Sequence, residues 1–171
     1  MERKQKVSTK PKKKTRKSSL TSLKNQTQAL CNKYARLRDC FGHGGANCIS
    51  CGVWKLYEEL DGGHFIPTTS SDIRFDERNI NAQCTKCNRF LHGNPRHYYK
   101  GMLRKYGKDV VDDLESREFT SKKWTREELE AIRTDYRDRI RRIERGEQPP
   151  EVSNHSRVEV RDVFADLGAA G

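Results

Sequence analysis

The sequence contains no long hydrophobic run. No stretch of its 171 residues approaches the roughly 20 apolar residues that cross a bilayer, and no apolar segment near Met1 has the form of a signal peptide. We therefore expect no membrane partner and a location in the reducing cytoplasm. In that compartment thiols stay reduced and are free to bind metal, so the six cysteines do not imply disulfides.

Hydrophobic side chains are also scarce. They make up 33% of the chain, whereas about 45–50% is typical of globular domains. The chain can therefore build only a small core, and a core of that size is marginally stable on burial alone. A bound metal that staples the fold is physically expected in such a domain.

Acidic residues are fewer than basic ones: the chain has 24 Asp and Glu and 35 Lys and Arg, which gives a net charge of +11. Residues 1–17 hold nine of the basic residues and only Glu2 in opposition, a net charge of +8. A segment this polar cannot bury enough surface to fold, so we expect a disordered basic tail. It is either a solvated tail or a sequence-independent contact with nucleic-acid phosphates, and we favour the second.

Four of the cysteines form two Cys-x-x-Cys pairs, Cys48 with Cys51 and Cys84 with Cys87. This spacing is typical of a tetrahedral Zn²⁺ site, because both sulfurs of each pair can reach one ion. The intervening residues 52–83 exceed the about 15–20 residues of a zinc ribbon, so the loop holds more than the metal site needs. Cys31 and Cys40 are expected to be inert core thiols.

The loop carries side chains suited to cutting a phosphodiester: Asp61, His64 and Asn79, with Asn88 directly after the last cysteine. Such cleavage needs a base to activate water and a hard divalent cation to stabilise charge. His64 suits the base. Asp61 and Asn88 suit a catalytic Mg²⁺ or Mn²⁺. Asn79 either orients the histidine or caps a following helix, and Asn81 is the alternative for the same role.

The apolar pattern predicts an α+β fold, with a zinc-stapled β-β-α unit in residues 41–120 between an N-terminal helical segment, 18–40, and a C-terminal one, 121–146. A helix is expected over 18–39, strands near 53–60 and from 64–66, and a short helix from 79 or 84 to 91. Thr125 and Glu128 form a capping box ahead of a helix over 125–145. Residues 147–171 are expected to be a disordered tail.

Two further sets of residues have open interpretations. Arg74, Arg78, Lys86, Arg89 and His92 lie in or beside the motif and are candidates for contact with DNA, although solvated charges are the ordinary state of such residues. The apolar stripes of the two long helices either cover the small domain or pair two protomers in a homodimer.

The linked motifs C-I-S-C-G (48–52), D-G-G-H (61–64), R-F-D-E-R-N-I-N-A-Q-C-T-K-C-N (74–88) and G-N-P (93–95) resemble those of the His-Asn-His (ββα-metal) endonucleases. They are more closely similar to the NinG/Rap family of lambdoid phages, and the similarity covers roughly residues 25–145. It implies a metal-dependent nuclease for branched recombination intermediates, including Holliday junctions and D-loops. The resemblance also implies that the protein acts in the host cytoplasm in association with the nucleoid, and that a phage recombination protein is a possible partner.

The chain also resembles the endonuclease VII resolvases, in which the asparagine after the final Cys-x-x-Cys helps to bind catalytic magnesium; Asn88 occupies that place. It departs from the common His-Asn-His pattern at Gly63, where an Asp usually precedes the histidine, and at Asn88, which replaces the final histidine. His92 nearby is a second metal ligand, a phosphate contact or a surface residue. The rival hypotheses are a nicking or restriction-type nuclease on duplex DNA and a catalytically inactive zinc-dependent DNA-binding module.

Overall fold

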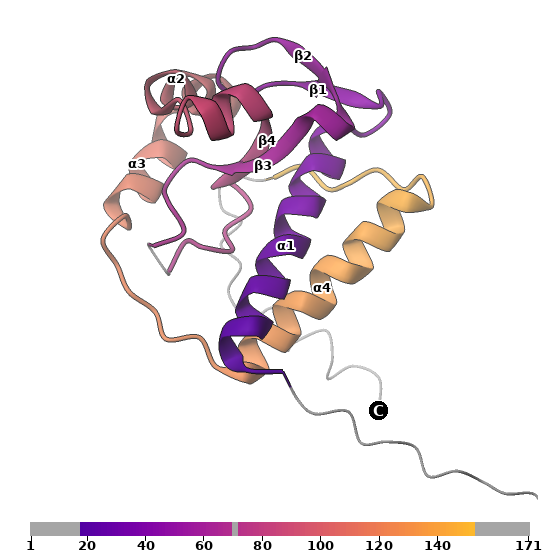
Figure 1. The fold of residues 1–171 in the computed structure, drawn as a ribbon, viewed down its shortest axis with the longest axis vertical. Coiled ribbons are helices and arrows are strands. Elements are labelled where there is room, and N and C mark those ends of the chain that lie inside the picture. The colour runs from indigo at the N-terminus through magenta and orange to yellow at the C-terminus, as the bar shows by residue number, and fades with distance from the viewer. Residues whose placement is uncertain (1–17, 70–71, 153–171) are drawn as a thin grey trace, which may run out of the picture.

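The computed structural model describes residues 18–69 and 72–152. The predicted basic tail, 1–17, and all but the first residues of the predicted C-terminal tail lie outside the described residues. The fold is small and α+β, with helices around two antiparallel sheets of two strands each (Figure 1). Within the described ranges, no helix has the length and apolar character to cross a membrane.

The two long helices lie side by side and run in the same direction (Figure 1). Helix α1 spans Leu20–Asp39 and α4 spans Arg126–Glu144, close to the predicted boundaries. Thr125 and Glu128 form the predicted capping box of α4. The apolar stripes of both helices meet in one core, where the rings of Tyr34 and Tyr136 pack edge to face at 5.2 Å. These stripes therefore cover the small domain from within the chain, which is the first of the two alternatives that the sequence left open.

The strands form two hairpins. Strand β1 (Gly45–Asn47) pairs with β2 (Trp54–Leu56), and β3 (Leu60–His64) pairs with β4 (Ile80–Cys84). One-turn helices η1 (Tyr57–Glu59) and η2 (Lys86–Phe90) follow β2 and β4, respectively. Helices α2 (Pro95–Tyr106) and α3 (Lys108–Ser116) complete the fold.

Several predicted boundaries in the centre of the chain are wrong. The strand predicted over 53–60 is only β2, and the next strand begins at Leu60 and ends at His64 instead of beginning there. The predicted helix start at Asn79 is wrong, since Ile80–Cys84 is strand β4. The alternative start at Cys84 lies two residues before η2, which is the helix of the unit. All five residues of β4 are buried. Tertiary contacts on both faces of the strand override its weak local preference.

The β3–β4 hairpin lies between the α1–α4 pair and the α2–α3 pair (Figure 1). On one face, β3 and β4 pack against α1. On the other, Tyr98 of α2 donates a hydrogen bond to the backbone oxygen of Gly63 at 2.9 Å. A second core under α2 and α3 holds Ile66 and Ile73 of the loop between the strands. The loop that follows His64 is therefore anchored rather than free.

Candidate functional site

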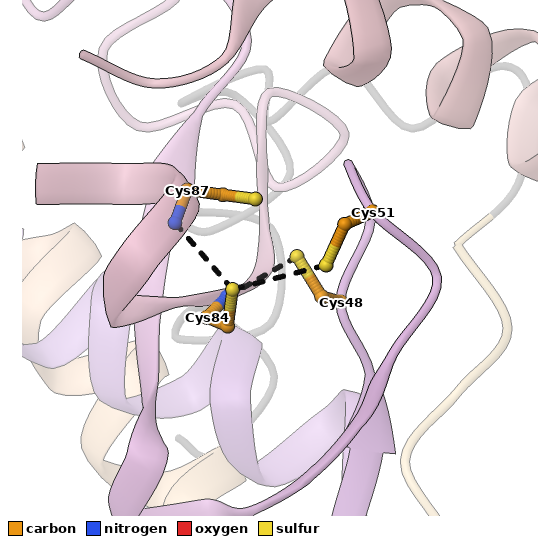
Figure 2. Close-up of side chains that lie close together, drawn as sticks. All are labelled: Cys48, Cys51, Cys84 and Cys87. Carbon is orange, nitrogen blue, oxygen red and sulfur yellow. Dashed lines mark hydrogen bonds between the residues drawn. The ribbon is translucent and has the colours of Figure 1, made fainter. Parts of the chain in front are cut away.

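The two Cys-x-x-Cys pairs meet at one point (Figure 2). Cys48 and Cys51 lie in the turn between β1 and β2, Cys84 ends β4, and Cys87 lies in η2. Their four sulfur atoms all lie within 4.8 Å of one another. Sulfurs bound to zinc at about 2.3 Å in a tetrahedron are about 3.8 Å apart, and Cys51 Sγ lies 3.9 Å from Cys84 Sγ. The cluster is thus compatible with a structural zinc site.

Donors around the cluster suit thiolates. The backbone N–H of Cys84 donates to Cys48 Sγ at 3.3 Å, and that of Cys87 donates to Cys84 Sγ at 3.4 Å. Asn94 donates its side-chain N–H to Cys87 Sγ at 3.4 Å. Such outer hydrogen bonds orient the sulfurs that hold a metal. The four cysteines are therefore the residues that would hold zinc and tie β4 and η2 to the β1–β2 turn.

Cys31 and Cys40 are buried and are not members of the four-sulfur cluster, although Cys40 packs in the same small core as Cys48, Cys84 and Cys87. Burial raises the pKa of the Cys31 thiol well above its ordinary value, and burial likewise raises the pKa of Cys40 to about 11. Both thiols therefore stay protonated near neutral pH, as the core assignment from the sequence expects.

Asp61, Asn88 and Arg89 meet beside the sulfur cluster. Asn88 donates from Nδ2 to Asp61 Oδ2 at 3.1 Å. Arg89 donates to both carboxylate oxygens, from Nε at 3.0 Å and from an Nη at 2.7 Å. Partial burial raises the pKa of the Asp61 carboxyl, but the hydrogen bonds from Arg89 and Asn88 outweigh it and hold the pKa below its ordinary value. Asp61 is therefore ionised at neutral pH.

This pair offers hard oxygen ligands. The Asp61 carboxylate lies on β3, and the Asn88 amide lies on η2 next to Cys87, so the sulfur cluster fixes the spacing between them. Mg²⁺ typically takes one or two protein oxygens and keeps its other ligands as water. The donor set would hold such a cation if the cation displaced the Arg89 guanidinium from the carboxylate and the Asn88 amide turned its Oδ1, instead of its Nδ2–H, toward Asp61.

His64 lies at the end of β3 and faces α1. Its Nε2 lies 3.0 Å from Gln28 Nε2 on that helix. Burial, followed by the positive charge of Arg74, lowers the pKa of His64 to about 4. The imidazole is therefore neutral at cellular pH, which is the form that a general base requires.

The two glycines of D-G-G-H provide space for neighbouring side chains. A Cβ at Gly62 would lie 2.8 Å from the Cα of Asn32, so α1 approaches β3 only because residue 62 has no side chain. A Cβ at Gly63 would lie 2.2 Å from Oε1 of Gln83. Gln83 cannot easily move, because its Nε2 donates to Ser50 Oγ at 2.7 Å and to the Gly93 carbonyl at 2.6 Å. The packing thus leaves no room for the Asp that usually precedes the histidine.

The structure divides the expected catalytic residues into two groups. Asp61 and His64 are three residues apart on β3, and side chains three apart on a strand point to opposite faces. Asp61 contacts η2, whereas His64 contacts α1. Across residues 18–69 and 72–152, no hydrogen bond joins His64 to Asp61 or to Asn88.

Asn79 holds the loop that follows His64. It is fully buried, its Oδ1 accepts from the N–H of Ile66 at 2.7 Å, and its Nδ2 donates to the carbonyl of Ile66 at 3.0 Å. The alternative role as a helix cap is wrong, since a strand follows. Asn81 does not share this contact, because its side chain faces α2 and donates to Tyr98 Oη at 3.3 Å.

The residues expected to contact DNA differ in exposure. Arg78 is 2% exposed and forms ion pairs with Asp76 at 2.6 Å and Asp113 at 2.7 Å, so its assignment to DNA binding is corrected to a structural one. Arg74 is partly buried and donates to the Thr68 carbonyl at 3.1 Å. The others are exposed on η2 or in the turn after it: Lys86, Arg89 and His92.

Gln28 and Gln83 contact the site without having been predicted. Each is brought there by tertiary packing, from α1 in one case and from β4 in the other. No local sequence signal marks them, because a glutamine on a helix or strand is ordinarily a solvated residue.

Comparison with known proteins decides the family. The family described as Bacteriophage Lambda NinG protein matches residues 1–147. The chain belongs to the NinG family. Its NinG relatives include Protein ninG of Escherichia phage 933W, 35% identical over 117 residues that make up 68% of this chain and 55% of the relative. Protein ninG of Escherichia phage lambda is 34% identical over 117 residues, which are 68% of this chain and 54% of the relative.

The chain thus spans about half the length of the curated NinG relatives that it matches. No solved structure matches the chain. The resemblance to the NinG family that the sequence motifs indicated is confirmed.

Proposed function

We propose that this NinG-family chain is a metal-dependent endonuclease that cuts branched DNA, including Holliday junctions and D-loops, in phage recombination. The observation that carries the proposal is the Asp61–Asn88 contact of 3.1 Å beside the four-cysteine cluster. A carboxylate and an amide held at a fixed spacing by a structural metal make a site for a hard cation.

Each residue has a role in this proposal. Asp61 and Asn88 would hold Mg²⁺ or Mn²⁺, which when bound stabilises charge at the scissile phosphate and on the leaving oxygen. His64 is the base in this proposal, because its imidazole is neutral. Since it faces α1 and not the Asp61–Asn88 pair, this role requires the site to rearrange when DNA and the cation bind. Arg89, whose side chain is 65% exposed, can pair with a phosphate oxygen in the forked geometry that it forms with Asp61. Asn79 fixes the loop after His64 through Ile66.

The charge of the chain supports DNA as the substrate class. A net charge of +11, with +8 in residues 1–17, favours a polyanionic partner. Paired cuts in opposed strands of a junction are most simply made by a two-fold dimer. A dimer of this chain would need a surface other than the α1–α4 stripes, since these are buried within the chain.

The division of the site favours a second candidate function. His64 faces α1, and Asp61 with Asn88 faces η2. In this second candidate the chain is a zinc-dependent DNA-binding module, and His64 is a packed structural residue.

The test uses zinc-loaded protein, a labelled four-way junction and linear duplex of the same sequence, each with and without Mg²⁺ or Mn²⁺. The proposal predicts nicks near the branch only with the divalent cation, and their loss in His64→Ala and Asp61→Asn. Asp112→Asn is the matched control, because Asp112 is an exposed carboxylate paired with Lys108. Equal cutting of duplex would favour the nicking enzyme, and binding without cutting would favour the DNA-binding module.

A further inference from the structure

We propose that the pocket between the β1–β2 hairpin and α2 holds an unpaired base of branched DNA, which stacks on the indole of Trp54 and accepts a hydrogen bond from Lys105. This inference rests on the proposed function, because it names where a base that has left the duplex at a branch point binds. It concerns binding and not the cut. Neither Trp54 nor Lys105 lies in a motif that the sequence indicates.

The pocket lies where three distant parts of the chain meet. Its volume is about 480 Å³, and its walls come mainly from the end of α1, the β1–β2 hairpin and Lys105 of α2. Sites for small molecules typically measure about 300–1,000 Å³. Helix α2 lies beside the hairpin (Figure 1), in contact at Gly101, where any side chain would strike the backbone of Ile49. The pocket is thus large enough for a base and is built by packing between elements.

Trp54 offers an aromatic surface at this pocket. It is 51% exposed, although it is one of only two tryptophans in the chain. A Cβ at residue 45 would lie 2.7 Å from Cζ2 of the indole, so the ring rests against Gly45 of β1 and depends on the missing side chain there. An indole held in this way is a stacking platform for any base, because every base has a π face.

Lys105 supplies a hydrogen-bond donor. Its Nζ donates to Asp39 Oδ1 at 2.8 Å and to Asn81 Oδ1 at 2.7 Å. An ammonium group has three N–H donors, and the third has no hydrogen-bond partner among the described residues. Arg38 also donates to Asp39, at 2.9 Å, so two cations face this one carboxylate. The pocket therefore offers a spare N–H and a net positive charge to the carbonyl oxygen or ring nitrogen of a base.

The exposed face of α2 suits the strand that carries such a base. The helix has four Lys and Arg residues and no Asp or Glu. Three of the four, Arg96, Lys100 and Arg104, are exposed, and a spacing of four residues puts them on one side of the helix about 6 Å apart. Across residues 18–69 and 72–152, none of the three forms an ion pair with an acidic side chain. A row of unpaired cations that ends next to Lys105 favours a nucleic-acid strand over a protein as the occupant.

Tryptophan fluorescence tests the stacking without any cleavage. Trp124→Phe leaves Trp54 as the only tryptophan, and Trp54→Phe leaves Trp124, which packs against Phe75 at 5.0 Å. The zinc-loaded full chain is titrated with single-stranded oligothymidylate, without added Mg²⁺ or Mn²⁺. We expect bound oligothymidylate to quench Trp54 and to leave Trp124 unchanged. Binding that does not quench Trp54 would overturn the inference.

Affinity for two matched duplexes tests the base pocket itself. One duplex has a single unpaired thymine, and the other is fully paired. Trp54→Ala should weaken binding to the first by about 5–150-fold, the share of one base–aromatic stack, with a much smaller effect on the second. Trp54→Phe should keep most of the affinity, and Lys105→Met should reduce the preference for the unpaired base. Phe119→Ala is the control, because Phe119 is an aromatic residue 93% exposed away from the pocket. Equal weakening of both duplexes by Trp54→Ala would overturn the inference.

The salt dependence of binding tests the α2 face. Lys100→Gln and Arg104→Gln should weaken binding to both duplexes alike and lower the salt slope by about 0.9 each. Lys33→Gln is the control, since Lys33 is already paired with Glu144 at 2.7 Å. A junction that is never cut but still binds through Trp54 would refute the nuclease function and leave the pocket established. Cutting by a chain whose preference for the unpaired base survives Trp54→Ala would overturn the pocket and leave the nuclease function intact.

Discussion

Replacing Asn79 with alanine should destabilise the loop that carries His64 out of β3. The Asn79 side chain is fully buried and makes its two shortest hydrogen bonds to the backbone of a single residue, Ile66, at 2.7 and 3.0 Å. A third contact, at 3.4 Å, reaches the carbonyl of Ile73. Alanine keeps none of these bonds. It leaves the N–H and the carbonyl of Ile66 without their side-chain partner.

The magnitude follows from those two groups. A buried polar group left without a partner costs about 1–3 kcal/mol, so with two such groups we expect Asn79→Ala to lower the free energy of unfolding by about 2–6 kcal/mol. This is a large part of the about 5–15 kcal/mol of an ordinary domain. Asn79→Asp keeps an acceptor for the Ile66 N–H but loses the donor to the Ile66 carbonyl, and it buries a charge. Aspartate should therefore not rescue the loss.

The assay is urea unfolding followed by circular dichroism, at constant zinc concentration. Asn25→Ala is the control, because Asn25 is exposed on α1 and a surface change of this kind stays within about 0.5 kcal/mol. An Asn79→Ala protein as stable as the control would refute the reasoning that this amide anchors the loop.

The buried Arg78–Asp76 ion pair, the buried His64 and the close packing at Gly63 can each be tested by substitution. Arg78→Met should cost up to about 3–5 kcal/mol in urea unfolding, because it removes the 2.6 Å ion pair of the buried Asp76 carboxylate and leaves Asp76 the longer 3.3 Å pair with Arg117. The exposed Arg89→Met should weaken salt-dependent DNA binding with little loss of stability. The reverse result would return Arg78 to the DNA surface. In the unfolded chain, His64 takes up a proton near its ordinary pKa of 6.5. In the folded chain, burial and, to a smaller extent, the positive charge of Arg74 lower the pKa of His64 to about 4, so the imidazole stays neutral until the pH falls to about 4. The free energy of unfolding should therefore fall by up to about 3 kcal/mol as the pH drops from about 6.5 to about 4. His64→Gln should reduce this dependence of the free energy of unfolding on pH. The same pH dependence in His64→Gln and the wild type would contradict the low pKa of His64. Gly63→Asp should lower the stability of the fold by about 1–3 kcal/mol through overpacking against Gln83. In thermal melts, the double variant with Gln83→Ala should recover part of the lost stability. Losses that simply add in the double variant would contradict the clash between residues 63 and 83.

Local signals predicted the outer parts of the fold and the metal cluster. The α1 and α4 helices have apolar periodicity and side-chain caps at Ser19 and Thr125, so their positions and boundaries can be predicted from residues close together in sequence. The cysteine spacing predicted a cluster that the structure brings within 4.8 Å. These features depend on residues close together in sequence.

The centre of the chain could not be predicted in the same way. Strand β4 reads I-N-A-Q-C, and its form depends on burial between α1 and α2 rather than on its own residues. The burial of Arg78 depends on Asp113, 35 positions away. The Gln28 contact likewise depends on the absence of a side chain at Gly62. Each of these is a long-range contact that sequence spacing does not encode.

The account depends most on a divalent-cation site made by Asp61 and Asn88, and binding of Mn²⁺ measured by electron paramagnetic resonance tests it directly. Titrating Mn²⁺ into the zinc-loaded chain should show one bound ion, with affinity lowered at least about tenfold by Asp61→Asn and by Asn88→Ala, since even outer partners of metal ligands contribute that much. The exposed control Asp112→Asn should bind as the wild type does. Equal Mn²⁺ affinity in Asp61→Asn and the wild type would contradict the account.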